Sequence, residues 1–158
     1  MKIAVVMGSK SDLPKLESGI DLIKSYGIEV VVRILSAHRT PEELTRFLEE
    51  IKDNTDVIIA AAGKAAHLPG VIAAQTLIPV VGLPIKSSTM DGMDSLLSIV
   101  QMPSGIPVAT VTIDSGMNAA LMAIQIASVK YPVLREKLAA YRKEMADKVL
   151  ADDASVEF

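Results

Sequence analysis

The chain has 158 residues, of which 50% are hydrophobic, 3% are aromatic and none is cysteine, and its formal net charge is −3. This length suits one domain with a substantial core, and the missing cysteines exclude disulfides, thiol nucleophiles and cysteine-based metal sites. The charge balance argues against a nucleic-acid partner, because neutralising phosphates requires clustered Lys and Arg. No apolar stretch reaches membrane-spanning length, so we expect a cytoplasmic protein with no membrane partner.

Apolar runs of strand length alternate with helical patterns along the chain. Strands are expected at residues 2–7, 29–35, 56–62, 79–84 and 107–113. Helices are expected at residues 12–26, 41–53, 65–76, 93–100 and 116–129. This repetition predicts an α/β fold, a three-layer doubly wound parallel sheet of flavodoxin-like strand order, in a single domain that covers residues 1–158.

An extra helix is expected at the C-terminus, over residues 131–150, with no strand before it. Its apolar residues recur every three to four positions and form one stripe: Leu134, Leu138, Tyr141, Met145 and Val149. The stripe could pack on its own domain or on a neighbouring subunit. We favour the neighbouring subunit, because the predicted fold is complete without this helix and the chain is unusually apolar for its size.

The loop after the first strand is the first candidate for ligand binding, because doubly wound sheets bind ligands at the carboxyl ends of their strands. It reads GSKSD, residues 8–12. Gly8 permits a tight turn, and the hydroxyls of Ser9 and Ser11 beside free N–H groups at a helix start suit a phosphate. Asp12 would repel a phosphate and suits sugar hydroxyls instead. Plain helix capping explains these residues equally well.

The loop after the second strand holds Ser36, Ala37, His38 and Arg39, directly before a helix start at Thr40-Pro41. Thr40 is expected to cap this helix, with Glu43 closing a capping box. Arg39 can bind a phosphate through two hydrogen bonds, and His38 can carry a proton near pH 7. For an isolated His-Arg pair, an ordinary solvated surface loop is the stronger alternative.

The loop after the third strand contains small residues that let backbone approach a ligand, together with the second histidine. It comprises Gly63, Lys64, Ala65, Ala66, His67 and Leu68. His67 either touches a substrate or is buried and holds the loop, and the buried role is favoured. Lys64 faces either solvent or the site. Two histidines without a carboxylate cluster make a poor metal site, so no metal is expected.

The segment 83–96 after the fourth strand, rich in Ser, Gly and Pro, could complete a pocket. Together the four loops predict a cofactor-free pocket for a phosphorylated, sugar-like ligand. The residues alone do not name the reaction.

Five long motifs that occur in this order resemble those of a known enzyme family, and this resemblance indicates a reaction. The motifs are VMGSKSD, SAHRTPE, AAHLPGVIAAQT, PVVGLP and DSLLSIVQMPSGIPVAT. Together they resemble the PurE family, and the AAHLPG form resembles its bacterial, class I mutases. The resemblance implies an N5-carboxyaminoimidazole ribonucleotide mutase of purine (IMP) biosynthesis, an enzyme without cofactor or metal. It also implies a flavodoxin-like subunit in a homo-octamer, with active sites at subunit interfaces.

The resemblance also implies roles for individual residues. Ser9, Ser11 and Arg39 would hold the 5′-phosphate of a phosphoribosyl aminoimidazole carbamate, and Asp12 would bind the ribose hydroxyls. His38 would carry the catalytic proton. The imidazole and carboxylate would lie against Ser36, Ala37, Gly63, Ala65, Ala66 and Leu68, with Gly8 and His67 also at the site.

The chain departs from the family pattern at Ala61 and Lys64, which stand where the family usually has glycine. Three alternatives remain open at this stage. One is direct CO2-dependent carboxylation of aminoimidazole ribonucleotide on the same fold. A second is a related carboxylase acting on a pyridine dinucleotide, which uses a cysteine that this chain lacks. The third is a non-catalytic flavodoxin-like module that binds a nucleotide or flavin, which the low aromatic content disfavours.

Overall fold

One sheet of five parallel strands, in the order β2-β1-β3-β4-β5, forms the centre of the molecule in this computed structural model, which describes residues 1–157. The strands are β1 (Lys2–Met7), β2 (Glu29–Ile34), β3 (Val57–Gly63), β4 (Val80–Ile85) and β5 (Ala109–Thr110). Strand order reverses between the neighbouring strands β1 and β3, which is the arrangement predicted from the sequence. The flavodoxin-like α/β fold is therefore confirmed.

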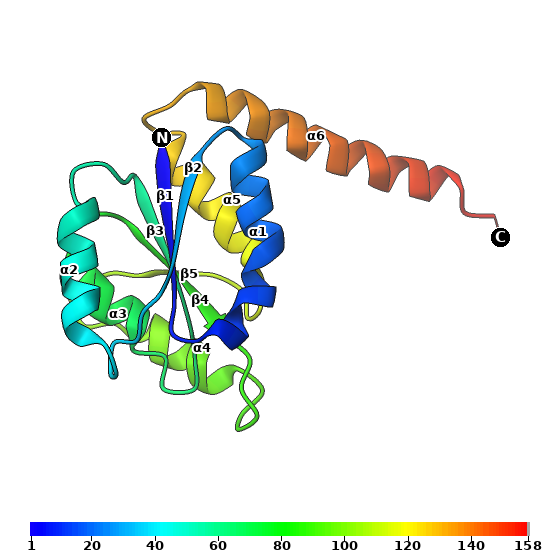
Figure 1. Cartoon of the computed structure of the whole chain (residues 1–158). Coiled ribbons are helices and arrows are strands. Elements are labelled where there is room, and N and C mark those ends of the chain that lie inside the picture. The colour runs from blue at the N-terminus through cyan, green and yellow to red at the C-terminus, as the bar shows by residue number, and fades with distance from the viewer. Residues whose placement is uncertain (158) are drawn as a thin grey trace.

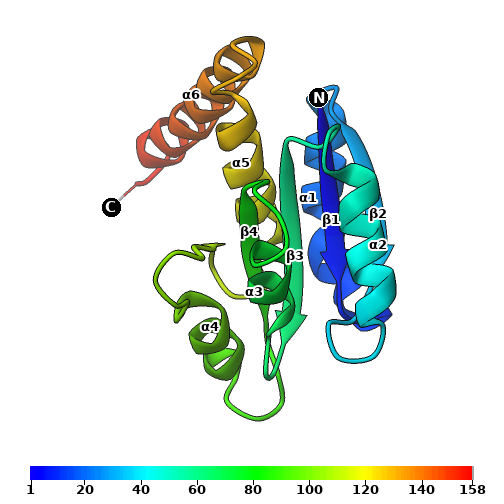
Figure 2. The same ribbon diagram turned by 90° about the vertical axis from the view of Figure 1, so that its left-hand side faces the viewer.

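Helices cover both faces of this sheet, giving three layers (Figures 1 and 2). The short helix η1 (Lys10–Asp12), α1 (Leu13–Ser25) and α5 (Gly116–Ala127) lie on one face. The other face is covered by α2 (Pro41–Ile51), α3 (Leu68–Ala73) and α4 (Met93–Val100). No helix among residues 1–157 combines the length and apolar character that a bilayer-spanning segment needs.

The two buried clusters follow from strand alternation. In β1, Ile3, Val5 and Met7 face the α1 and α5 side, whereas Ala4 and Val6 face the α2 side. Every strand residue from Ile3 to Met7 is fully buried, which explains why β1 reads as a continuous apolar run. The core is built from aliphatic side chains, as the low aromatic content of the sequence predicts.

Close packing of α1 against α5 depends on two glycines. A Cβ on Gly19 would collide with the carbonyl group of Gly116, and a Cβ on Gly116 would collide with the carbonyl oxygen of Lys15. This contact holds α1 close to α5, and the start of α1 carries Asp12 into the site described below.

Three predicted elements differ from the structure by more than two residues at one or both ends, and the other bounds agree within two residues. The last strand, expected over 107–113, pairs only at Ala109–Thr110, because Pro107 lacks an N–H donor and the chain turns away towards α5. The helix expected from residue 65 begins at Leu68, because Lys64 adopts a left-handed backbone conformation that ends the strand in a turn. The C-terminal helix begins at Val133 and continues to Ala154, beyond its expected end at residue 150.

The C-terminal helix α6 (Val133–Ala154) leaves the three-layer body and projects away from it (Figure 1). Leu134 and Leu138 are buried against the core, while Met145 and Val149 further along the same stripe are exposed. The first turns of α6 therefore pack on their own domain. Tyr141 and Met145 still border a pocket shared with α5, and the last turns of the helix are exposed.

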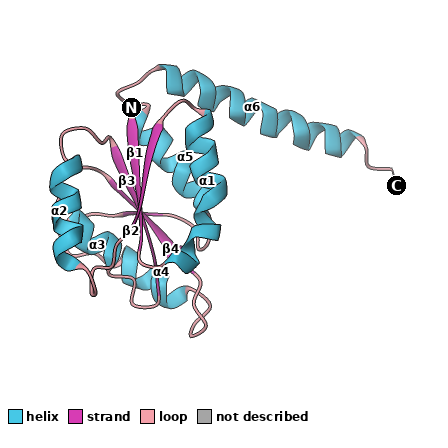
Figure 3. Cartoon of the chain, viewed as in Figure 1, coloured by secondary structure: helices cyan, strands magenta, loops and turns pink. Residues whose placement is uncertain are grey.

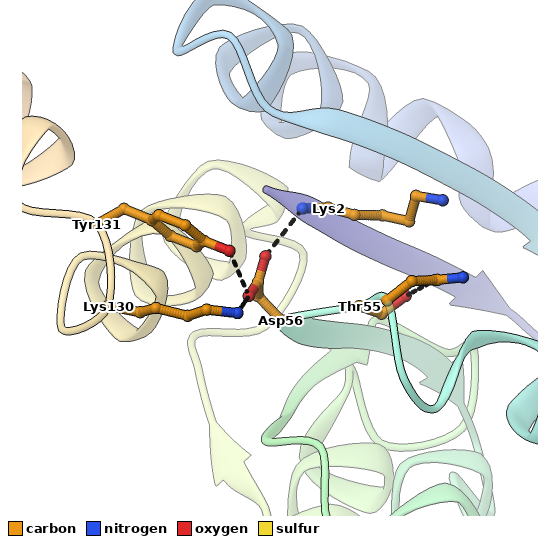
Figure 4. A network of polar contacts seen from close by, with 6 residues as sticks. Lys2, Thr55, Asp56, Lys130 and Tyr131 are labelled. Carbon is orange, nitrogen blue, oxygen red and sulfur yellow. Dashed lines mark hydrogen bonds and ion pairs between the residues drawn. The ribbon is translucent and has the colours of Figure 1, made fainter.

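A polar network anchors the connection into α6 at the amino-terminal end of the sheet (Figure 4). The Asp56 carboxylate accepts hydrogen bonds from the Lys2 backbone N–H at 2.9 Å, Lys130 Nζ at 2.9 Å and the Tyr131 hydroxyl at 3.1 Å. Burial opposes the charge of Asp56, but these donors outweigh burial and hold its pKa below the usual 3.8.

We expect D56N to lower the free energy of unfolding at pH 7 by about 1–3 kcal/mol, because it weakens charge-assisted hydrogen bonds. A lowered pKa in the folded state stabilises the fold above the unfolded-state pKa, and this contribution is lost as pH falls through the folded-state pKa. The difference between D56N and wild type should therefore be full at pH 7 and become smaller as the pH falls from 3.8 towards the lower folded-state pKa. Urea unfolding at pH 7 and pH 3 measures it, with exposed Asp53 changed to Asn as the control. A constant difference at both pH values would contradict the assignment.

Candidate active site

A cavity of about 550 Å³ opens at the carboxyl edge of the sheet. Figure 3 shows the loops that follow the first four strands at this end of the sheet, opposite the N-terminus. Residues from all four loops line the cavity. They are Gly8, Ser9, Ser11, Asp12, Ser36, Ala37, His38, Arg39, Ala62, Gly63, Lys64, Ala65, His67, Leu68, Ile85, Lys86, Ser87 and Ser88.

Every residue predicted for the site lies at this cavity except Ala66. The Ala66 side chain is 1% exposed and packs in the core cluster under α2 and α3, which removes it from the cavity wall. Its neighbours Ala65 and His67 face the opening instead.

In the loop after β1, two hydroxyls face the same space. Ser11 Oγ lies 2.8 Å from Ser9 Oγ, and Ser9 Oγ also accepts the backbone N–H of Ser11 at 3.3 Å. Ser9 thus caps η1, as the capping alternative required, while Ser11 remains exposed. Gly8 has no left-handed φ, so a tight turn is not the reason for this glycine. A Cβ at Gly8 would meet no protein atom within 4 Å.

Asp12 occupies the N-cap position of α1 but makes no capping hydrogen bond with its side chain. Asp12 is 8% exposed, and burial raises the pKa of its carboxyl group, although hydrogen bonds from the Ser11 side chain and the Ser9 backbone partly offset the effect. A buried carboxylate that caps no helix remains available to accept hydrogen bonds from a ligand.

The loop after β2 is folded around the Ser36 side chain. Ser36 Oγ accepts hydrogen bonds from the backbone N–H groups of His38 at 3.4 Å and Arg39 at 3.2 Å. Arg39 Nη2 also donates to the Gly8 carbonyl at 2.9 Å, which ties this loop to the loop after β1. The guanidinium therefore lies at the junction of both loops, and Ser9 and Ser11 line the same cavity.

The predicted capping box at α2 is wrong. Thr40 is the N-cap residue, but its hydroxyl accepts the Ser36 N–H at 2.9 Å and makes no capping hydrogen bond to α2. The turn of the functional loop competes for this hydroxyl, so Thr40 braces the loop that carries His38 and Arg39.

The two histidines of the chain contact each other across the cavity. His38 Nε2 lies 3.0 Å from His67 Nδ1, with the rings perpendicular. His67 is exposed, so the expectation of a buried, structural histidine is wrong. One nitrogen must donate and the other accept, so protonation of either ring changes the hydrogen bond of its partner. The pair can hold and move a proton at the centre of the cavity.

The loop after β4 completes the wall of the cavity. The sequence analysis predicted this segment, 83–96, without naming individual residues. Lys86 forms an ion pair with Asp91 at 2.6 Å, and Ser87 Oγ donates to Asp94 at 2.6 Å. Only their position after a strand could have signalled them. Among residues 1–157, no three His, Cys, Asp or Glu side chains are grouped as a metal site requires.

The family model described as AIR carboxylase matches residues 2–148. The chain belongs to this family. It is 52% identical over 145 residues to a Pyrococcus abyssi protein named N5-carboxyaminoimidazole ribonucleotide mutase, covering 91% of this chain and 83% of that protein. A Methanocaldococcus jannaschii protein of the same name is 50% identical over 157 residues, covering 98% of this chain and 97% of that protein.

The crystal structure of Treponema denticola PurE superposes on this chain with a TM-score of 0.91. The two share 30% sequence identity, and the match covers 99% of each chain. The PurE resemblance stated from the motifs is thereby confirmed at the level of sequence and of fold.

We expect D12N to be more stable than wild type at pH 7. A raised pKa in the folded state means that ionised Asp12 costs folding free energy above that pKa, and that the cost disappears below the unfolded-state value of 3.8. Thermal unfolding of D12N between pH 3 and pH 8 should show a gain at neutral pH that fades towards pH 3. The exposed Asp21 changed to Asn is the control. A D12N protein less stable than wild type at pH 7 would show that the carboxylate stabilises the fold.

Proposed function

We propose that this chain is an N5-carboxyaminoimidazole ribonucleotide mutase. It moves the carboxylate of its substrate from the exocyclic nitrogen to C4 of the imidazole, giving 4-carboxy-5-aminoimidazole ribonucleotide in purine biosynthesis. The observation that carries the proposal is the His38–His67 pair, 3.0 Å apart in a cavity lined by the family's loops. The names of the two relatives described above support the same reaction.

The proposed substrate has a phosphate at one end and an imidazole with a carboxylate at the other. The phosphate binds the Arg39 guanidinium and the hydroxyls of Ser9 and Ser11, all of which come from residues that line the cavity. Asp12 accepts hydrogen bonds from the ribose hydroxyls. This placement directs the imidazole towards the two histidines and the small residues of the loop after β3.

The proposed reaction conserves atoms without a cofactor. The bond between the exocyclic nitrogen and the carboxyl carbon breaks, CO2 leaves, and His38 gives a proton to the nitrogen. The electron-rich C4 then attacks the retained CO2, and His38 takes the C4 proton to restore aromaticity. The proton lent in the first step returns in the second, so one histidine serves both. His67 holds the orientation and tautomer of His38 through their hydrogen bond.

Retention of CO2 requires a covered cavity, whereas His38 and His67 are exposed in the single chain. We therefore include in the proposal a homo-octamer in which neighbouring subunits cover the sites. The projecting half of α6, with Met145 and Val149 exposed, is the surface offered for packing on a neighbour. The proposed location is the cytoplasm, because a charged nucleotide substrate does not cross membranes unaided.

Sedimentation equilibrium tests the assembly. At micromolar concentration we expect the mass of eight chains, because the exposed stripe of α6 is covered in the assembly. A monomer mass under these conditions would contradict the assembly without touching the proposed reaction.

We expect H38N to lose activity by about a thousandfold or more, because Asn cannot transfer a proton. The assay supplies purified protein with N5-carboxyaminoimidazole ribonucleotide and no cofactor, and in parallel with aminoimidazole ribonucleotide plus bicarbonate. Rapid conversion of the first compound and slow reaction of the second support a mutase; efficient use of only the second identifies a direct carboxylase.

The thermal stability of H38N should match that of wild type, because His38 is exposed and its main contact is with His67. A folded and fully active H38N protein would remove His38 from the mechanism.

A further inference from the structure

Lys64 is a cavity residue with an unusual backbone. It follows β3 directly, lines the cavity, and is exposed. Its φ is +55°, in the left-handed region that residues other than glycine seldom adopt. Such a conformation is unfavourable for a residue with a side chain, because the Cβ comes too close to backbone atoms. Glycine would remove this strain, so the lysine side chain is present at a cost to the fold.

The side chain of Lys64 has no ion-pair partner among the described residues, whereas Lys86, the other lysine of the cavity, is paired with Asp91. Arg39 donates to the Gly8 carbonyl, and Lys86 is paired with Asp91 at 2.6 Å. Within the part of the chain that the structure describes, no carboxylate lies within ion-pair distance of Lys64. A lysine that lines a ligand cavity and has no carboxylate partner can offer its ammonium group to an anionic ligand.

Lys64 belongs to the reactive end of the cavity. It lies on the loop that carries His67, which contacts His38, whereas Arg39 is tied to the loop after β1. The proposed substrate has two anionic groups, and Arg39 serves the phosphate. The carboxylate, which is the group that moves, has no cation assigned to it.

We propose that the Lys64 ammonium group binds the carboxylate of the substrate and of the product, and so selects carboxylated imidazole nucleotides over aminoimidazole ribonucleotide. This inference rests on the proposed function. Both the carbamate and the C4 carboxylate carry this negative charge, and the decarboxylated nucleotide does not. Lys64 is therefore a substrate-binding residue that acts on affinity, while His38 transfers the proton.

The test compares K64Q with wild type. We expect the KM for N5-carboxyaminoimidazole ribonucleotide, and in the reverse direction for the C4-carboxylated nucleotide, to rise about tenfold, as loss of one charge-assisted contact predicts. The inhibition constant of aminoimidazole ribonucleotide should change less than about twofold. K64R should retain most of the discrimination, because it keeps the charge.

Two controls separate charge from structure. Lys10 is an exposed lysine near the same edge that does not line the cavity, so K10Q should leave all three constants unchanged. K64G should melt at a higher temperature than wild type and still show the weakened binding of K64Q. Equal effects of K64Q on carboxylated and decarboxylated nucleotides, or none on either, would overturn the inference. Absence of mutase activity in wild type would instead overturn the proposed function.

Discussion

The parallel pairing of β1 with both β2 and β3 is the constraint on which the site depends. Met7 at the end of β1 lies opposite Ile34 in β2 and Ala61 in β3. The loops that follow these three strands therefore start at the same edge of the sheet. Residues far apart in sequence thereby become neighbours, as His38 and His67 show at 3.0 Å. Antiparallel pairing of any of these strands would send one loop to the opposite edge and separate the histidines.

The two ends of the sheet meet different energetic demands. At the amino-terminal end, Asp56 is surrounded by donors that favour its charge, and it ties the α5–α6 connection to β1. At the carboxyl end, burial raises the pKa of Asp12 and so disfavours its charged form, and Lys64 adopts a left-handed backbone conformation. Stability is thus gained away from the cavity and partly given up around it, which is typical of sites arranged to bind a ligand.

The hydrophobic periodicity of the sequence and the order of its segments predicted most of the fold. The continuous apolar runs of β1, β3 and β4 and the amphipathic helices between them predicted the layers and the strand order. The limits of β5 and α3 differ from the prediction, because the first depends on Pro107 before an edge strand and the second on the left-handed turn at Lys64. A hydrophobic pattern does not reveal that a residue lacks a backbone N–H donor or that it adopts a left-handed φ.

For the site, loop position after each strand predicted where its residues gather, and all but Ala66 line the cavity. The contacts between loops were not predictable, because they depend on how far each side chain reaches across the edge. The His38–His67 hydrogen bond is the main example, and the bracing of Ser36 by the Thr40 hydroxyl is another. A helix-start motif such as Thr40-Pro41 predicts where a helix begins, but the partner of the Thr hydroxyl is decided by the loop.

The proposed reaction depends on keeping CO2 beside C4, and carbon labelling tests that step most directly. N5-carboxyaminoimidazole ribonucleotide carrying ¹³C in its carbamate would be converted in a single turnover with unlabelled bicarbonate in excess. We predict that most of the ¹³C appears in the C4 carboxylate of the product, because the cavity retains CO2 between decarboxylation and recarboxylation. A product whose carboxylate carries the unlabelled bulk carbon would contradict the account, since the carboxyl group would then have left the protein before it was added again.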